Sequence, residues 1–336
     1  MTLDPQTAAV LESIELQKIP SLNELPIEVA REAVVASLPQ APKAEVAKVE
    51  DRIVEVAGIE HPSLEQFNDE AAFTASEQLA LRIYTPFYNQ TNDADKPAVH
   101  VYFHGGGWLL GNLDTHDEIC RELCAAAKVI VVSVDYRLAP EHPFPSALSD
   151  AYAALTWVAN NLEQLGARKG DNALSVGGDS AGANLAAAVS VLTREQPLAN
   201  GQTICFQLLC YPVADATMSS KSYQDNAEGY ILTKEMMEWF WDNYCPSSEQ
   251  KNHMLASILN TEDCTQLPPA LVITAEYDPL RDEGQLYAER LSNAGVSVES
   301  ICFDGLVHGF LSQISYIDSA KESLALVTQR LNAAHT

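Results

Sequence analysis

The stretch Gly178-Asp179-Ser180-Ala181-Gly182 decides the fold. It follows a short apolar segment, residues 173–177, that we predict as a strand, and it opens an alanine-rich segment, residues 181–195, that we predict as a helix. Glycines two positions before and two after the serine permit a very tight turn, because larger side chains would clash there. Such a turn is a nucleophile elbow, which exposes the serine hydroxyl. The sequence therefore predicts Ser180 as a nucleophile.

Predicted strands and helices alternate along most of the chain around this turn. The expected strands are residues 52–59, 79–84, 98–103, 129–134, 173–177, 204–211, 270–275 and 296–303. The expected helices are residues 149–162, 181–195, 283–294 and 316–331. This alternation indicates right-handed βαβ units, so we expect an α/β fold with a mainly parallel central sheet flanked by helices.

Two segments fall outside this alternation. Residues 1–45 carry apolar positions at helical spacing, interrupted by prolines, which predicts short amphipathic helices. Residues 218–263 are rich in aromatic residues and methionine and lack strand character. We therefore expect an N-terminal helical segment (1–45), a catalytic core formed by residues 46–217 and 264–336, and an insertion (218–263) between two core strands.

The composition is that of a globular protein with a strongly acidic surface. Of the 336 residues, 47% are hydrophobic, which is enough for a buried sheet and its covering helices. The 46 acidic and 20 basic residues give a formal net charge of −26. Because no cluster of Lys and Arg offsets this charge, a polyphosphate partner would be repelled, and we exclude nucleic acid as a partner. The same charge disfavours anionic bilayers, so we expect no stable membrane association.

Targeting signals and cysteine usage predict a cytoplasmic protein. Residues 1–18 lack the basic and apolar regions of a signal peptide, and no run approaches the ~18 apolar residues of a membrane span. The seven cysteines are odd in number and scattered, which fits a reducing compartment. Cys120 and Cys124 have no second Cys or His pair nearby, so we interpret them as packed thiols rather than metal ligands.

The segment His104-Gly105-Gly106-Gly107-Trp108 directly follows the strand expected at residues 98–103. Three consecutive glycines let backbone N–H groups approach a substrate oxygen, which is typical of an oxyanion-hole loop. The alternatives are a flexible glycine turn or a phosphate-binding loop, but the segment has neither the G-x-G-x-x-G spacing nor the lysine of a Walker sequence. We expect His104 to orient its own loop.

Asp278 and His308 each lie just past an expected strand, as Ser180 does. Because the carboxyl ends of parallel strands meet at one edge of the sheet, the three side chains can come together there. Their order along the chain, Ser, Asp and then His, is the order found in α/β hydrolases. Glu276 and Asp282 are alternative acids, which we interpret as structural residues.

Together these motifs resemble those of the bacterial hormone-sensitive-lipase-like esterases (family IV), which have the α/β-hydrolase fold. The matching segments lie between roughly residues 75 and 315 and are His104 to Trp108, Asp135 to Pro145, Gly178 to Gly182, Tyr211-Pro212, Asp278 to Asp282 and His308 to Phe310. The resemblance implies that Ser180, Asp278 and His308 form a catalytic triad.

The same resemblance implies further parts of the site. The N-terminal helices and residues 218–263 would form a helical cap over it. Two residues depart from the family pattern, since Ala183 stands where glycine is usual and Trp108 where phenylalanine is common, and both could reshape the pocket. By the resemblance, the oxyanion hole consists of the backbone N–H groups of Gly106, Gly107 and Ala181.

We therefore expect a carboxylesterase that forms an acyl-enzyme and hydrolyses small-molecule esters with short- to medium-chain acyl groups, without a metal or organic cofactor. The same triad would serve an amidase, a lactonase or a sugar or antibiotic deacetylase, and a non-catalytic ligand receptor on this fold is a further alternative. The sequence leaves a homodimer open.

The acyl preference is expected from the apolar helix at residues 234–244. The aromatic and methionine side chains of this helix, together with Trp108 beside the oxyanion loop, should close the site around acyl groups of about four to eight carbons. We expect no activation at a lipid interface. We expect Arg137 and Glu141 to brace the site as structural ion partners.

Overall fold

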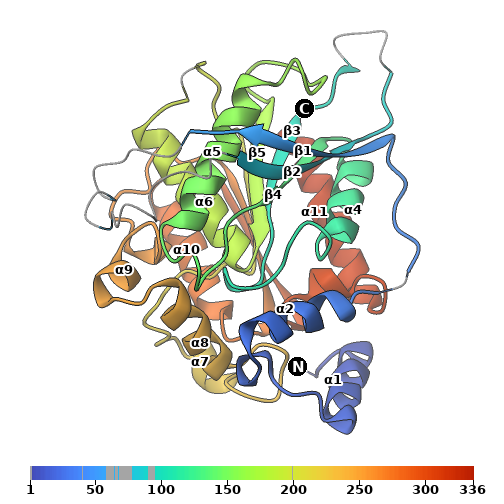
Figure 1. Cartoon of the computed structure of the whole chain (residues 1–336), viewed down its shortest axis with the longest axis vertical. Helices are drawn as coiled ribbons and strands as arrows, with labels where there is room; N and C mark the ends of the chain where they lie inside the picture. Colours follow the sequence, from blue (N-terminus) through green and yellow to red (C-terminus); the bar gives the residue numbers. More distant parts are fainter. Residues whose placement is uncertain are drawn as a thin grey trace.

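A computed structural model describes residues 2–39, 41–57, 64, 67, 78–89, 95–198 and 200–336. Its centre is an eight-stranded sheet in the order β1-β2-β4-β3-β5-β6-β7-β8 (Figure 1). β2 runs antiparallel to both of its neighbours, and the strands from β4 across to β8 are parallel. The strands are β1 (Lys48–Glu55), β2 (Gln78–Thr85), β3 (Val99–Phe103), β4 (Ile130–Asp135), β5 (Leu174–Asp179), β6 (Gln207–Cys210), β7 (Ala270–Tyr277) and β8 (Val298–Val307).

The first strand begins earlier than the sequence predicts. β1 starts at Lys48 instead of residue 52, and the last two positions of the predicted strand, 58 and 59, lie outside the described residues. β1 is an edge strand in which only Val54 is buried. Because most of its side chains face solvent, hydrophobicity does not mark where it starts. Its pairing with β2, in which Lys48 opposes Thr85, sets that boundary instead.

Helices cover both faces of the sheet. In β3, Val101 and Phe103 pack into a hydrophobic cluster shared with α5, α6 and α10, whereas Tyr102 packs into a second cluster shared with α4 and α11. Successive residues of a strand face opposite sides, so one short strand feeds both clusters. The resulting three-layer α/β/α arrangement confirms the predicted fold class. The helices are α1 (Pro5–Gln17), α2 (Ile27–Ala36), α4 (Asp117–Ala127), α5 (Ser146–Asn160), α6 (Ala181–Glu195), α7 (Ser222–Asp225), α8 (Lys234–Tyr244), α9 (Ser248–Asn252), α10 (Arg281–Asn293) and α11 (Asp318–Ala334), with the 3-10 helices η1 (Leu22–Glu24), η4 (Ile258–Asn260) and η5 (Phe310–Gln313).

The N-terminal helices and the insertion lie at one end of the molecule, where Figure 1 shows α1, α2, α7 and α8 close to one another. The structure describes all of residues 218–263, which contain helices and no strand, as the sequence predicts. The division of the chain into a core and two cap segments stays a prediction.

Arg31 ties α2 to the core. Its guanidinium donates to the carbonyl oxygens of Leu109 and Ala139, both at 2.9 Å, and to the two carboxylate oxygens of Glu141 at 2.8 and 2.7 Å. Arg137 pairs instead with the buried Asp150, at 2.8 Å. As expected, Glu141 and Arg137 both form ion pairs. Glu141 pairs with Arg31 of α2, whereas Arg137 pairs with Asp150 of α5.

Candidate active site

The elbow at the end of β5 places Ser180 in a strained backbone conformation. Ser180 has φ 55° and ψ −118°, outside the usual regions for a residue with a side chain, and α6 begins at the next residue. A Cβ at Gly178 or Gly182 would lie 2.3 or 1.9 Å from the carbonyl oxygen of Phe103. Glycine is therefore required at both positions, because β3 and α6 pack directly against the turn.

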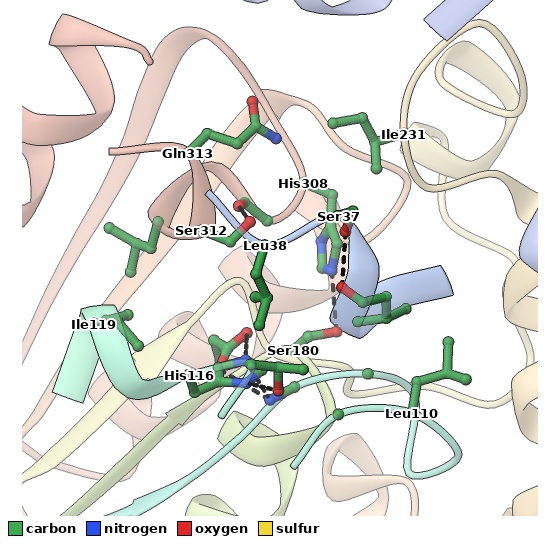
Figure 2. A pocket seen from close by; sticks show the side chains of 18 of the residues that line it. Ser37, Leu38, Leu110, His116, Ile119, Ser180, Ile231, His308, Ser312 and Gln313 are labelled. Carbon is green, nitrogen blue, oxygen red and sulfur yellow. Dashed lines mark hydrogen bonds and ion pairs between the residues drawn. The ribbon is translucent and has the colours of Figure 1, made fainter. Parts of the chain in front are cut away.

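Asp278 and His308 meet Ser180 at the same edge of the sheet, and Figure 2 shows His308 next to Ser180. His308 follows the last residue of β8 and Asp278 follows the last residue of β7. The Asp278 Oδ2 lies 2.7 Å from His308 Nδ1, and His308 Nε2 lies 3.0 Å from the Ser180 Oγ. Since an ionised carboxylate only accepts, Nδ1 carries the proton, and Nε2 can accept from the serine hydroxyl. The structure thus brings all three predicted residues into one hydrogen-bonded line.

Hydrogen bonds hold both the carboxylate and the backbone of Asp278. Its side chain is fully buried, and its second oxygen, Oδ1, accepts a hydrogen bond from the Leu280 N–H at 2.8 Å. The side-chain amide of Asn226, from the insertion, donates to the Asp278 carbonyl oxygen at 3.1 Å. These contacts leave Oδ2 directed at His308.

The two alternative acids point elsewhere. The Glu276 Oε2 accepts a hydrogen bond from the Gly305 N–H at 2.8 Å. The Asp282 carboxylate accepts from the Ser222 N–H at 2.8 Å and from Arg281 at 2.9 Å. Both carboxylates therefore bind backbone groups of β8 and α7 rather than His308, which agrees with the structural role expected for them.

The glycine loop after β3 lines the same cavity as Ser180. Gly106 and Gly107 have φ of 112° and 60°, which favours glycine. A Cβ at Gly107 would lie 2.2 Å from the ring of Phe240, so α8 packs directly on this loop. Ala181 is the first residue of α6, and its N–H therefore has no acceptor within the helix. This arrangement allows the three N–H groups expected for the oxyanion hole to be offered to a substrate oxygen.

Asp179, which the sequence analysis did not single out, joins the elbow to the glycine loop. Its Oδ1 accepts from the Gly105 N–H at 3.0 Å and from the Tyr102 hydroxyl at 2.7 Å, and His116 Nε2 lies 3.2 Å away. Burial alone would raise the pKa of this carboxyl group, but the charge and hydrogen bond of His116 and the hydroxyl of Tyr102 outweigh burial and lower it. A charged residue inside an otherwise small and apolar elbow is the signal that could have identified Asp179.

His104 contacts its own loop, as the sequence predicts. Its Nδ1 lies 2.8 Å from the Gly105 carbonyl oxygen, and its ring stacks on Tyr136 with centroids 4.2 Å apart. The Tyr136 hydroxyl donates to the His104 carbonyl oxygen at 2.7 Å. Burial, aided by the neighbouring His116, lowers the pKa of His104 to about 3, so its ring is neutral at neutral pH.

A cavity of about 380 Å³ opens above Ser180. Helix α8 contributes Met236 and Phe240, one turn apart, to its wall. The prediction that Trp108 lies in this wall is wrong, because its indole is fully buried and stacks on Tyr244 with centroids 4.1 Å apart. Leu38, from the segment after α2, extends into the cavity near Ser180 (Figure 2). Further apolar residues of the wall are Val10, Leu22, Val34, Leu110, Ile119, Ile231, Leu232 and Leu311.

Metal ligation has no structural support in the part of the chain that the structure describes. No group of three or more His, Cys, Asp or Glu side chains is placed there to hold a metal ion. Cys120 and Cys124 are both buried free thiols, and burial raises the pKa of Cys124 to about 12.

Among the described helices, none is long and apolar enough to cross a bilayer.

Residues 100–312 match the protein family described as alpha/beta hydrolase fold. The chain belongs to this family. Among curated relatives, this alpha/beta hydrolase is 43% identical to carboxylesterase NlhH of Mycobacterium tuberculosis over 263 residues, which cover 76% of this chain and 79% of that protein. It is 37% identical to ethyl acetate hydrolase of Pseudomonas putida, over 75% of this chain and 78% of the relative.

A solved structure extends this similarity over the whole chain. The ester hydrolase EH1AB1 from the metagenome of Lake Arreo, in complex with a bipyridine phosphonate derivative, is 34% identical, with a TM-score of 0.84. The similarity covers 99% of both chains. The predicted family and the predicted enzyme class, a carboxylic ester hydrolase, are therefore confirmed for this alpha/beta hydrolase.

Proposed function

We propose that this alpha/beta hydrolase cleaves small-molecule carboxylic esters with short- to medium-chain acyl groups, using Ser180 as nucleophile, His308 as general base and Asp278 as the acid that orients the histidine. The observation that carries the proposal is the hydrogen-bonded line from Asp278 through His308 to Ser180, which ends at a cavity of about 380 Å³.

Acylation begins when His308 Nε2 takes the proton of the Ser180 hydroxyl as Oγ attacks the ester carbonyl carbon. The carbonyl oxygen becomes an oxyanion, which the N–H groups of Gly106, Gly107 and Ala181 stabilise. His308 then gives its proton to the leaving alcohol oxygen, and the bond between that oxygen and the carbonyl carbon breaks. Asp278 holds the imidazole in the required tautomer and stabilises its protonated form.

Deacylation repeats these steps with water as the nucleophile. The water gives one proton to His308 Nε2 and attacks the acyl-enzyme, and the carboxylic acid leaves as Ser180 regains its proton. The histidine must be neutral to begin either half-reaction, so we expect activity to rise from acid toward neutral pH.

The size of the cavity supports the acyl preference. Its volume of about 380 Å³ lies near the lower end of the roughly 300–1,000 Å³ range of small-molecule sites. Met236 and Phe240 close one side and Leu38 extends across it, so a long chain would have to displace these residues. One relative is named for ethyl acetate, an ester with a two-carbon acyl group, which is consistent with a small site. We therefore propose that turnover is fastest for acyl groups of about four to eight carbons, which a cavity of this size can enclose.

The test compares the wild-type protein with Ser180→Ala on esters of increasing acyl length, below and above the concentrations at which they form droplets. We expect the wild type to be fastest at about four to eight carbons and the variant to lose turnover by on the order of 10⁴-fold or more. A fluorophosphonate should label only the wild type. Rates that peak at long chains and rise when droplets form would indicate a lipase instead.

Amides and lactones in the same panel test the alternative activities. Faster turnover of either class than of simple esters would replace the esterase proposal with an amidase or a lactonase. A wild-type protein that neither reacts with the fluorophosphonate nor hydrolyses any member of the panel would be a non-catalytic receptor.

A further inference from the structure

The wall of the cavity that follows His308 along the chain carries two polar side chains beside the apolar Leu311. One residue, Gly309, separates His308 from η5, and η5 contributes Ser312 and Gln313 to the cavity. Figure 2 shows Gln313 on this wall, with its amide nitrogen turned toward the side on which Ile231 lies. Ile231 comes from the insertion and also lines the cavity. The amide and the isoleucine thus line the same cavity from two separate segments.

The Gln313 side chain has no hydrogen-bond partner among the residues that the structure describes. Only 9% of the residue is exposed, and its Oε1 is buried without a hydrogen bond within the part of the chain that the structure describes. None of the hydrogen bonds among the described residues uses its Nε2. Buried polar side chains in folded proteins normally have partners. Because Oε1 is buried, Nε2 is the amide atom that can still meet a ligand in the cavity, and it has no partner among the described residues.

The proposed mechanism places the leaving alcohol next to this wall. The tetrahedral carbon carries the Ser180 oxygen, the oxyanion, the acyl chain and the alcohol oxygen, and only the alcohol oxygen must receive a proton from His308 Nε2. The alcohol portion of the ester therefore departs on the side of His308, which is the side from which η5 extends.

The two side chains of η5 match the hydrogen bonding of a hydroxyl group. The Ser312 hydroxyl donates to the Gly309 carbonyl oxygen at 2.7 Å, so its own lone pairs remain able to accept. The Gln313 Nε2 has two N–H groups that can donate. A substrate hydroxyl can donate to the first and accept from the second, while Ile231 contacts the carbon chain.

We propose that Ser312 and Gln313 form a subsite for a hydroxyl group on the alcohol portion of the ester, so that monoesters of diols and polyols are preferred over esters of plain alkyl alcohols. This inference rests on the proposed function. An alkyl group in the subsite displaces water from the Gln313 amide, and it cannot form the hydrogen bonds that the water made with that amide. Sites that hydrogen-bond a substrate hydroxyl discriminate strongly against the analogue that lacks it.

The test compares 2-hydroxyethyl butyrate with propyl butyrate, which differ by a terminal hydroxyl in place of a methyl group. We expect the wild-type kcat/KM to favour the hydroxylated ester by about 3- to 10-fold, the range of a single net hydrogen bond. Gln313→Leu should bring this ratio close to one. Gln329→Leu, the same change at an exposed position of α11 outside the cavity, should leave the ratio at its wild-type value. The ratio does not depend on the fraction of folded enzyme, because both esters are measured on one preparation.

Gln313→Met gives a second measurement of the same ratio, with a flexible apolar side chain that needs no repacking. A ratio near one in the wild type, or a wild-type ratio retained in both Gln313 variants, overturns the subsite. Hydrolysis of p-nitrophenyl butyrate separates this result from failure of the proposed function. A protein that cleaves p-nitrophenyl butyrate without preferring the hydroxylated ester refutes the subsite alone, whereas a protein that cleaves none of the three esters refutes both.

Discussion

Helix α6 and helix α2 both contribute to the site but are held in the fold very differently. Every residue of α6 from Ala181 to Leu192 is buried. In α2, Ala30 is the one buried residue, and Arg31 makes the polar contacts with the core described above. In α1 the one buried residue is Thr7. The groups proposed to perform the chemistry therefore stand on a tightly packed core, whereas the N-terminal groups that line the cavity stand on helices attached by few buried contacts.

This difference separates two kinds of substitution. Packing in the core holds the nucleophile, the histidine and the glycine loop in one geometry, so changes there should alter the chemical step. Local opening costs least where few apolar groups are buried, so changes in the N-terminal helices should alter substrate binding instead. This division between the chemical step and substrate binding would be wrong if kcat responded to changes in α2 and KM to changes in the core.

The largest effect is expected for the acid of the triad. Asp278→Asn keeps the size of the side chain but removes its charge and stabilises the wrong tautomer of His308, so kcat should fall by roughly 10⁴-fold. Asp282→Asn is the matched control, since Asp282 contacts Ser222 and Arg281 rather than the histidine. Steady-state kinetics on p-nitrophenyl butyrate would measure both variants. A larger loss in Asp282→Asn would transfer the orienting role to that residue.

A smaller loss is expected at Asp179, which acts through the loop it holds. Asp179→Asn weakens the charge-assisted hydrogen bond to the Gly105 N–H, so we expect kcat to fall by roughly 10- to 100-fold with KM little changed. Glu276→Gln serves as control, because it also accepts from one backbone N–H, that of Gly305, away from the glycine loop. Equal kcat values for the two variants would contradict a positioning role for Asp179.

Stability at acid pH should depend on histidines buried in the core. Burial lowers the pKa of His100 and His104 to about 3 and that of His335 to about 4. The unfolded chain binds these protons first, since free histidine titrates near about 6.5, so stability is fully present above that pH and falls as the pH drops toward the folded values. At pH 5 each of these histidines should cost about 2 kcal/mol.

Urea unfolding of the wild type and His335→Asn at pH 8 and pH 5 measures this contribution. We expect the variant to be less stable at pH 8, because it loses the hydrogen bond to Ser175, yet to lose about 2 kcal/mol less between the two pH values. The same loss of stability in both proteins would show that His335 is not a source of the acid sensitivity.

The smallest effect is expected from releasing α2. Arg31→Met removes the contacts with Leu109, Ala139 and Glu141, so KM for p-nitrophenyl butyrate should rise by about 3- to 10-fold, while kcat stays within about twofold. Arg194→Met is a matched control, because Arg194 also binds two carbonyl oxygens and one carboxylate but lies in the last turn of α6, away from Ser180. A fall in kcat without a change in KM would mean that α2 positions the glycine loop.

The sequence could single out the residues proposed as nucleophile, base and acid, which the structure brings together, because each role imposes a local pattern. Ser180 requires glycines around it, and Asp278 and His308 must follow strands that end at the same edge. The direction of a side chain imposes no such pattern. Trp108 lies next to the glycine loop in the sequence, yet its φ of 61° turns the chain there and its indole packs on Tyr244 rather than in the cavity.

Contacts between segments far apart in the sequence were equally hidden. The hydrogen bond from the Gly105 N–H to Asp179 joins residues 74 positions apart, and Arg31 reaches Glu141 across 110 positions. Gln313 could not be singled out from sequence either, because its interest lies in the absence of a partner among the described residues. Pairing across the chain depends on packing, which periodicity and motif spacing do not report.

Helix α8 offers protein engineers two sets of positions with opposite tolerance. Met236, Met237, Phe240 and Trp241 are all buried in the hydrophobic core, but Met236 and Phe240 also line the cavity. Randomising position 236 would explore new acyl specificities on an intact scaffold, whereas randomising 237 and 241 would mainly yield misfolded clones. A library for a longer acyl chain should therefore begin with smaller residues at position 236, because Phe240 also packs against Gly107 and its replacement would disturb the glycine loop.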